Sequence, residues 1–349
     1  MTLLPKQSLV DSNSPLLVAP APRLIEVGNY LNRLSTDLTS AEYHGLVGSY
    51  SSSQLKTMLE DPEKFYKKYI TKELAKEEGG AHFDVGTYFH TAVLEPEKLD
   101  EECVVYTGGI RSGKKWEDFK ALHAGKAIIT NSDLIVADRL IAGVKASKIA
   151  MAYLEGAECE ISAFMKIYVF KGEIFAFRDQ VVLESAGEIA EDCYVLTAHG
   201  WAQDSLSFDE ENIKDFGFPL IIKVRADALN RKQMNISDLK STKSNVNLES
   251  EMQKAVDQYN YDMSASLYLD IFSFVCRETF KEFIWIYANK ETGACQNWVQ
   301  DGESQIVGRA MWRHAVLLIA KNSKKKWKFE DEARMLPPSP WKRHWLTKI

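Results

Sequence analysis

Cysteine pairs are missing from this chain of 349 residues. The cysteines include no C-x-x-C pair, and their number is odd. A disulfide framework and a zinc site on paired cysteines are therefore not expected, and a reducing compartment, the cytoplasm, is the expected location. The five cysteines are Cys103, Cys159, Cys193, Cys276 and Cys295.

Long apolar runs and an excess of positive charge are also missing. No stretch approaches the roughly 20 apolar residues of a membrane span, and the first residues lack the basic start and apolar core of a signal peptide. We expect neither a membrane partner nor a secretion signal. The formal charge of −6 at pH 7 argues against a protein that simply coats nucleic acid.

The charge is unevenly spread along the chain. Segment 183–215 holds nine Asp or Glu residues against Lys214 alone, whereas 309–349 holds eleven Lys or Arg residues and three acids. A polyanion such as nucleic acid should therefore meet the C-terminal segment and avoid the acidic one.

Two short strands carry the strongest chemical signal. Residues 224–229 alternate apolar and polar side chains, and 236–240 place Asp238 and Lys240 on one face. If residues 231–234 form the loop, the strands pair with Asp227 opposite Asp238. Opposed side chains lie roughly 5 Å apart at Cβ, so the two carboxylates could grip one cation.

The ligand type suggests the ion. Carboxylate oxygens suit Mg²⁺, and Mn²⁺ would also fit. Lys240 would then orient or help deprotonate an attacking water and offset charge on a phosphate. The alternative is a surface hairpin whose Asp and Lys residues make exposed ion pairs.

Motifs along the chain resemble the PD-(D/E)XK nuclease superfamily, and more closely the RecB nuclease domain and the RecE exonuclease VIII family. The resemblance covers about residues 48–96 and 220–290. It rests on the hairpin and on two helical segments: Ser51-Ser52-Ser53-Gln54-Leu55-Lys56 with Pro62 and Phe65, and Gly86-Thr87-Tyr88-Phe89-His90 continuing to Leu94-Glu95-Pro96. It implies an α/β fold with a restriction-endonuclease-like core, in which helices flank a central mixed sheet that carries an insertion.

The resemblance also implies roles for single residues. His90 is expected as a third metal ligand and the backbone carbonyl of Leu239 as a further one, beside Asp227 and Asp238. Tyr268 matches the tyrosine of a family Q-x-x-x-Y motif that positions the substrate strand, but Ser264 stands where that motif has Gln. Glu160 matches an E-x-S-x-F strand. It could face the metal site, but we expect it to be only charge at a strand edge.

A basic segment near residue 111 has two interpretations. It nearly fits a phosphate-binding G-x-x-x-x-G-K-[ST] loop, but Lys115 replaces the hydroxyl residue, so a nucleotide site is not expected. It resembles instead an R-x-G-K-x-W element of exonuclease VIII relatives, and an exposed basic turn is an equal alternative. The side chains expected to contact DNA are Arg111, Lys114, Lys115, Trp116 and Arg225.

The domain organisation is expected to be simple. Residues 1–45 would form an N-terminal extension, either loose or packed on a neighbouring subunit, and 46–349 the nuclease domain. Within that domain, 170–219 would be the acidic insertion and 309–349 a basic C-terminal segment. Helices are expected over 84–94, 249–278 and 303–320. Residues 127–154 show a helical pattern after Thr130-Asn131-Ser132-Asp133.

By resemblance, the expected activity is a 5′-to-3′ exonuclease acting on double-stranded DNA ends. The same resemblance implies a ring-shaped homo-oligomer, a trimer or tetramer, that cooperates with a single-strand annealing protein in phage-type recombination. Two alternatives stay open: a structure-specific or restriction-type endonuclease on the same core, and a catalytically silent DNA-binding relative. Ser264 is the main support for the silent relative.

Overall fold

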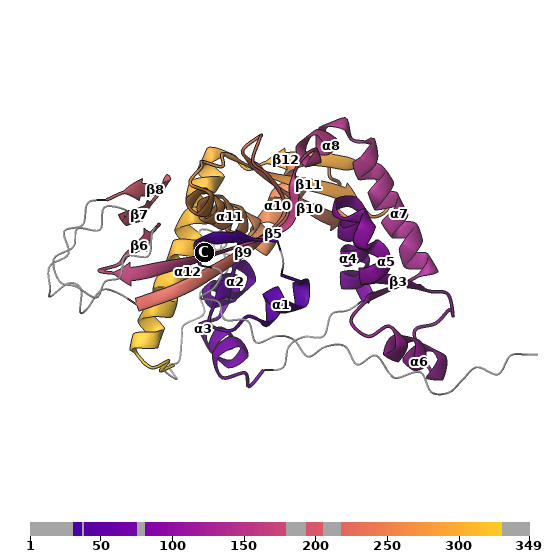
Figure 1. Ribbon diagram of the computed structural model, residues 1–349, viewed down its shortest axis with the longest axis horizontal. Helices are drawn as coiled ribbons and strands as arrows, with labels where there is room; N and C mark the ends of the chain where they lie inside the picture. The colour runs from indigo at the N-terminus through magenta and orange to yellow at the C-terminus, as the bar shows by residue number, and fades with distance from the viewer. Residues whose placement is uncertain (1–30, 37, 75–80, 179–192, 205–217, 330–349) are drawn as a thin grey trace, which may run out of the picture.

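A large mixed sheet forms the centre of the computed structural model, which describes residues 31–36, 38–74, 81–178, 193–204 and 218–329 (Figure 1). Strands β10 and β11 are parallel, and the other neighbours along the sheet are antiparallel. In spatial order the strands are β12 (Cys295–Val299), β11 (Glu282–Asn289), β10 (Asn235–Thr242), β9 (Phe218–Asn230), β5 (Glu158–Phe170), β6 (Glu173–Phe177), β7 (Cys193–Thr197) and β8 (Gly200–Gln203).

Helices cover this sheet in two groups. The main core joins sheet residues to α2 (Ser52–Glu60), α11 (Tyr261–Cys276) and α12 (Gly302–Lys324). A second core joins β10 and β11 to α4 (Ala81–Leu94), α7 (Asn131–Ala146) and α8 (Lys148–Leu154). Figure 1 shows α12 and α7 toward opposite ends of the molecule. The expected fold class, a central mixed sheet flanked by helices, is confirmed.

Shorter elements complete the described part. Strands β1 (Arg33–Ser35) and β2 (Tyr50–Ser51) pair with β5 and β9, while β3 (Cys103–Tyr106) and β4 (Ala127–Thr130) form a small parallel sheet. No helix among the described residues is long and apolar enough to cross a membrane. The remaining helices are α1 (Ser40–Gly45), α3 (Pro62–Phe65), η2 (Tyr66–Ile70), η3 (Pro96–Lys98), α5 (Leu99–Glu102), α6 (Lys114–Leu122) and α10 (Glu249–Tyr259).

Local sequence signals explain several of these boundaries. The hairpin loop falls at residues 231–234, as predicted, between β9 and β10. Ser51 begins α2 in a capping box with Gln54, whose side chain accepts the Ser51 N–H at 2.7 Å. Asp61 caps α3, and Pro62 occupies its first turn, where a missing N–H costs nothing. The predicted loop is thus confirmed.

One prediction about the helices is wrong in part. The helix expected over 249–278 is broken at Asn260, whose φ of 48° is left-handed and ends α10 before α11 begins. The helical pattern expected after Thr130 agrees with the structure, because Thr130 caps α7, which begins at Asn131. Residues 127–130 form β4 and pair with β3.

The N-terminal extension and the acidic insertion are described in part. Within 1–45, β1 pairs with β5 and α1 packs near β9, so the described portion contacts the sheet of its own chain. Within 170–219, strands β6, β7 and β8 continue the sheet beyond β5. Of the nine acids in 183–215, all but Asp204 lie outside the described residues, as do residues 330–349 of the basic segment.

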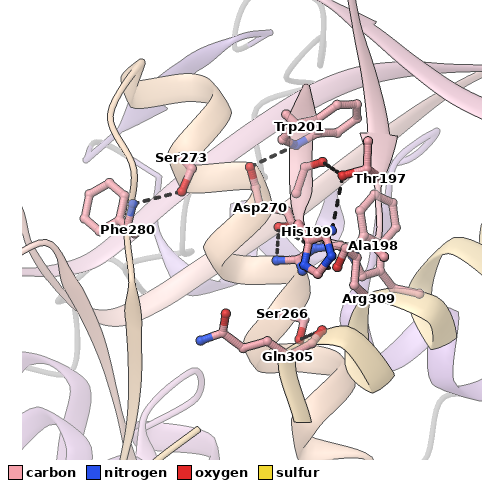
Figure 2. A network of polar contacts seen from close by, with 12 residues as sticks. Thr197, Ala198, His199, Trp201, Ser266, Asp270, Ser273, Phe280, Gln305 and Arg309 are labelled. Carbon is pink, nitrogen blue, oxygen red and sulfur yellow. Dashed lines mark hydrogen bonds and ion pairs between the residues drawn. The ribbon is translucent and has the colours of Figure 1, made fainter. Parts of the chain in front are cut away.

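A buried ion pair joins α11, α12 and the β7–β8 turn. The Arg309 guanidinium donates to both carboxylate oxygens of Asp270 at 2.8–3.0 Å and to the Ala198 carbonyl at 2.7 Å. Trp312 donates to the same carboxylate at 2.9 Å, and Trp201 donates to the Asp270 carbonyl. Figure 2 shows Asp270 between Trp201 and Arg309. The charged and polar groups of this network are therefore satisfied by hydrogen bonds within the protein.

Candidate active site

Three side chains from α4, β5 and β9 meet at one point. One ligand atom from each of His90, Glu160 and Asp227 lies within 4.8 Å of the others. His90 Nδ1 is 3.3 Å from Asp227 Oδ2. His90 is presented by α4, whose neighbouring residue Phe89 is fully buried with Leu239 in the second core. Packing of α4 on the sheet thus fixes where the imidazole lies.

Glu160 enters the site through an unusual backbone conformation. The β5–β9 ladder pairs Cys159 with Ala228 and Ile161 with Ala226, and Glu160 between them has a φ of 53°. A left-handed φ in a strand is uncommon for a residue with a Cβ, and such strain clusters at functional sites. The expectation that Glu160 is charge at a strand edge is wrong. β5 is an interior strand, and the Glu160 carboxylate lies beside Asp227.

The expected pairing of Asp227 with Asp238 is also corrected. The β9–β10 ladder pairs Ile236 with Leu229 as predicted but ends at Ser237 and Ala228, one residue before the two aspartates. Asp227 Oδ2 instead accepts the backbone N–H of Leu239 at 2.8 Å. Asp238 falls outside the group of His90, Glu160 and Asp227, and its carboxylate forms an ion pair with Lys240. The two aspartates still line one pocket.

Partial burial and neighbouring negative charge raise the pKa values of carboxylates in this site. Burial and the neighbouring Asp227 raise the pKa of Glu160 to about 7, although Arg225 opposes the shift. Burial also raises the pKa of Asp238, against the effect of Lys240. Carboxylates in such positions disfavour their charged forms unless a cation joins them. Two carboxylates and an imidazole within one ion's reach suit Mn²⁺ well and Mg²⁺ through the oxygens, so the donor set fits the expected metal.

Two lysines approach the carboxylates from β10 and α2. The Nζ atoms of Lys240 and Lys56 each lie 5.2 Å from the ring centre of Tyr261. Burial disfavours the charge on Lys240, but Asp238 and Asp227 outweigh this effect and raise its pKa. For Lys56, burial and the charge of Lys240 lower the pKa to about 8. The pocket therefore holds one firmly charged lysine and a second that loses its proton more readily.

These groups line one cavity of about 320 Å³ between α1, α2, α11 and the sheet. Tyr268 and Ser264 of α11 lie in its wall. Ser264 Oγ is 2.7 Å from Ser52 Oγ at the start of α2. The residue that replaces the family glutamine thus ties α11 to α2.

Arg225 lines the same cavity, but its guanidinium is already engaged. Its Nε lies 2.8 Å from Glu160 Oε2, and its Nη2 donates to the Leu38 carbonyl at 3.0 Å. The structure gives it a positioning role toward Glu160 beside the expected contact with DNA.

The basic segment near residue 111 divides into two parts. Lys114 and Lys115 are exposed at the start of α6. Arg111 differs from the expectation, because its guanidinium donates to Asp133 at 2.8 Å and to the Ile128 carbonyl at 2.7 Å, and lies over the Trp116 ring. Asp133 neutralises Arg111, so this arginine and Trp116 hold the loop against β4 rather than presenting a free cation.

Comparisons with known proteins identify the fold. No family model matches the sequence, and no curated protein matches it. A candidate exonuclease from Eubacterium rectale, known from a crystal structure, superimposes with a TM-score of 0.50 at 13% identity, over 89% of this chain and 98% of that chain. A structure of the protein SSO0001 reaches a TM-score of only 0.24 at 14% identity, over 69% of this chain and 88% of that one, which is too low to support an argument.

The fold and the site together characterise the protein. The chain has a nuclease-like α/β core, and that core carries a histidine and clustered carboxylates beside a charged lysine. At 13% identity the likeness to the Eubacterium rectale protein establishes the fold alone.

Proposed function

We propose that this protein is a metal-dependent DNA nuclease of the PD-(D/E)XK superfamily. The observation that carries the proposal is the meeting of His90, Glu160 and Asp227 at one point. Glu160 and Asp227 also line one pocket with Asp238 and Lys240. Carboxylates that lie this close repel one another, so the cluster makes chemical sense as a cation site. The fold shared with a candidate exonuclease supports the same activity.

Each residue has a role in phosphodiester hydrolysis. A bound Mg²⁺ or Mn²⁺ would neutralise the carboxylates and polarise the phosphate. Asp227 is held in place by the Leu239 N–H, and Glu160 by Arg225, so both carboxylates are oriented before substrate arrives. The Lys240 ammonium, oriented by Asp238, lies where it can position the attacking water and offset charge on the phosphate. The water oxygen bonds to phosphorus, the bond to the leaving oxygen breaks, and that oxygen gains a proton.

The finer assignment rests on the sequence motifs. Similarity to RecB and RecE nucleases supports a 5′-to-3′ exonuclease on double-stranded DNA ends, with Tyr268 and the Leu239 carbonyl assisting. The same similarity supports a ring-shaped homo-oligomer and a single-strand annealing partner in recombination. Ser264 departs from the family motif, and its hydrogen bond to Ser52 keeps that wall of the pocket in place.

Digestion of end-labelled linear duplex tests this proposal. The wild type should release label with Mg²⁺ or Mn²⁺ and stop with a chelator, and release from a 5′ label first would establish the polarity. Lys240→Ala should remain folded and lose activity. If the variant digests as fast as wild type, the assigned site is wrong. Covalently closed circular DNA should stay intact, and its cleavage would favour an endonuclease.

A further inference from the structure

A basic surface lies outside the catalytic pocket, where two segments far apart in sequence come together. Lys64, Lys67 and Lys68 follow the i, i+3, i+4 spacing along α3 and η2. Such residues are neighbours on one helical face. The last turns of α12 repeat this spacing, and Lys326 and Lys328 follow. We call the two segments together the lysine face: Lys64, Lys67, Lys68, Lys321, Lys324, Lys325, Lys326 and Lys328.

Stacked aromatic rings hold the two segments together. The Trp327 ring stacks on Tyr66 and Phe65 at centroid distances of 5.1 and 5.7 Å, and Phe329 lies 5.8 Å from Tyr66. Lys326 and Trp327 both have φ of 53°, and the Trp327 N–H donates to the Asn322 carbonyl at 2.8 Å. The chain thus adopts a strained turn so that Trp327 reaches Phe65 and Tyr66. These aromatic contacts therefore hold the two segments of the lysine face together in the folded chain.

Among the residues that the structure describes, the lysines of this face outnumber the acids. Residues 321–328 contain five lysines and no acid, and residues 61–73 contain Asp61, Glu63 and Glu73 beside four lysines. Glu63 is paired with Lys67 at 2.6 Å, and Asp61 caps the backbone of α3. Like charges at this spacing on a helix repel, so the arrangement is unfavourable unless a polyanion lies against it.

The chemistry of the face favours double-stranded nucleic acid. Lysine ammonium groups are point charges that suit phosphate oxygens and do not read bases. The aromatic rings stack on one another, so they are not open platforms for unpaired bases. The face also follows the pocket closely along the chain, because Lys56 of α2 lines the cavity and lies only about 6 Å along the helix axis from the end of α2, after which α3 begins.

We propose that the lysine face binds the phosphate backbone of duplex DNA whose end or nick lies in the catalytic pocket. The proposal rests on the proposed nuclease function in taking DNA as the polyanion. It adds a second contact, through which the protein holds the part of the duplex that is not being cut.

Binding measured without cleavage tests the proposal. In an Asp227→Asn background with chelator, a labelled duplex of about 30 base pairs is titrated over a range of salt concentrations. The test variant carries Lys64→Gln, Lys321→Gln, Lys324→Gln and Lys325→Gln. It should bind at least about tenfold more weakly, and its log–log salt slope should fall by about 3.6, since each of the four phosphate contacts contributes roughly 0.9.

The matched control changes four exposed lysines on other elements, Lys145, Lys148, Lys232 and Lys281, to Gln. It should bind duplex like its parent, and equal losses in both variants would overturn the proposal. So would wild-type binding by the test variant, tighter binding of single strands than of duplex, or binding of anionic phosphatidylserine vesicles in place of duplex.

Hydrolysis of bis(p-nitrophenyl) phosphate, in an otherwise wild-type background with Mn²⁺, separates this proposal from the nuclease function. The test variant should retain the wild-type rate, which also shows that it is folded. If wild type hydrolyses neither this ester nor DNA but its duplex binding still depends on the four lysines, the nuclease proposal fails and the lysine face stands.

Discussion

Two clusters of charge, one buried and one partly buried, differ in how their charges are balanced. At the α11–α12 contact, burial raises the pKa of Asp270, while Arg309 and Trp312 oppose the shift by donating hydrogen bonds. In the proposed catalytic pocket, Glu160 and Asp227 lie together with one arginine beside Glu160. The first cluster is complete without any ligand, whereas the second would gain from an added cation. Charge withdrawn from water can thus stabilise the architecture in one place and, by our proposal, supply chemistry in another.

Removing Arg309 should produce the largest effect on stability. Arg309→Ala leaves the Asp270 carboxylate buried without its cation, so the free energy of unfolding should fall by about 3–5 kcal/mol. Urea denaturation measures this loss. The double variant Asp270→Asn, Arg309→Met keeps an acceptor for Trp312 and should recover much of it. A loss below about 1 kcal/mol in Arg309→Ala would mean that the pair acts like an exposed one.

Asp227→Asn should have the opposite effect: it should lower activity without lowering stability. Nuclease activity should fall at least about 100-fold. The unfolding free energy should stay level or rise, because one of two repelling carboxylates is neutralised and the Asn oxygen can still accept the Leu239 N–H. Digestion rates and urea denaturation measure the two effects. Asp118→Asn, at an exposed position of α6, is the control and should change neither. If Asp227→Asn unfolds, the carboxylates of this pocket stabilise the fold, as the Asp270 cluster does.

Lys56→Met should stabilise the protein near neutral pH. The pKa of Lys56 is lowered to about 8, so between pH 8 and 10.5 the unfolded chain binds more protons than the folded one. Wild-type stability should therefore rise with pH across that window, and the charged lysine should cost about 1–2 kcal/mol below it, after discounting for solvent near the amine. Unfolding free energies from pH 7 to 10.5 measure this. In Lys56→Met the unfolding free energy should no longer rise across this pH window. If the unfolding free energy of the wild type does not rise either, the prediction is wrong.

Ser264→Ala should have the smallest effect. It removes the hydrogen bond to Ser52, whose net contribution should be about 1 kcal/mol or less. The double variant Ser52→Ala, Ser264→Ala should destabilise by less than the sum of the single variants, since both remove the same contact. Additive losses would show that the two hydroxyls do not depend on each other.

The hairpin shows how much of the site could be predicted from sequence. Turn residues and two-residue alternation fixed the loop at 231–234 and the pairing of Leu229 with Ile236. The same rules placed Asp227 against Asp238, but the ladder ends at Ser237, where β10 departs from β9. Alternation describes regular pairing and contains no information about where pairing stops.

Glu160 was missed for a related reason. A strand pattern assumes extended backbone at every residue, and the left-handed φ at this position is a property of the folded sheet. The E-x-S-x-F match was the available signal. The pairing of Arg111 with Asp133 could not be predicted either, because Asp133, 22 residues later, reaches the arginine only after β4 and α7 have folded.

The short helix α1 should make one wall of the pocket less stable against local unfolding than the other. Its six residues depend on the Thr39–Glu42 capping box, yet Ser40, Tyr43 and His44 form part of the cavity wall. The opposite wall belongs to interior strands, whose amides should exchange with solvent only when the whole domain opens. In a hydrogen-exchange experiment, the amides of 40–46 should therefore exchange early and slow when substrate fills the cavity, while those of β5 and β9 should not change.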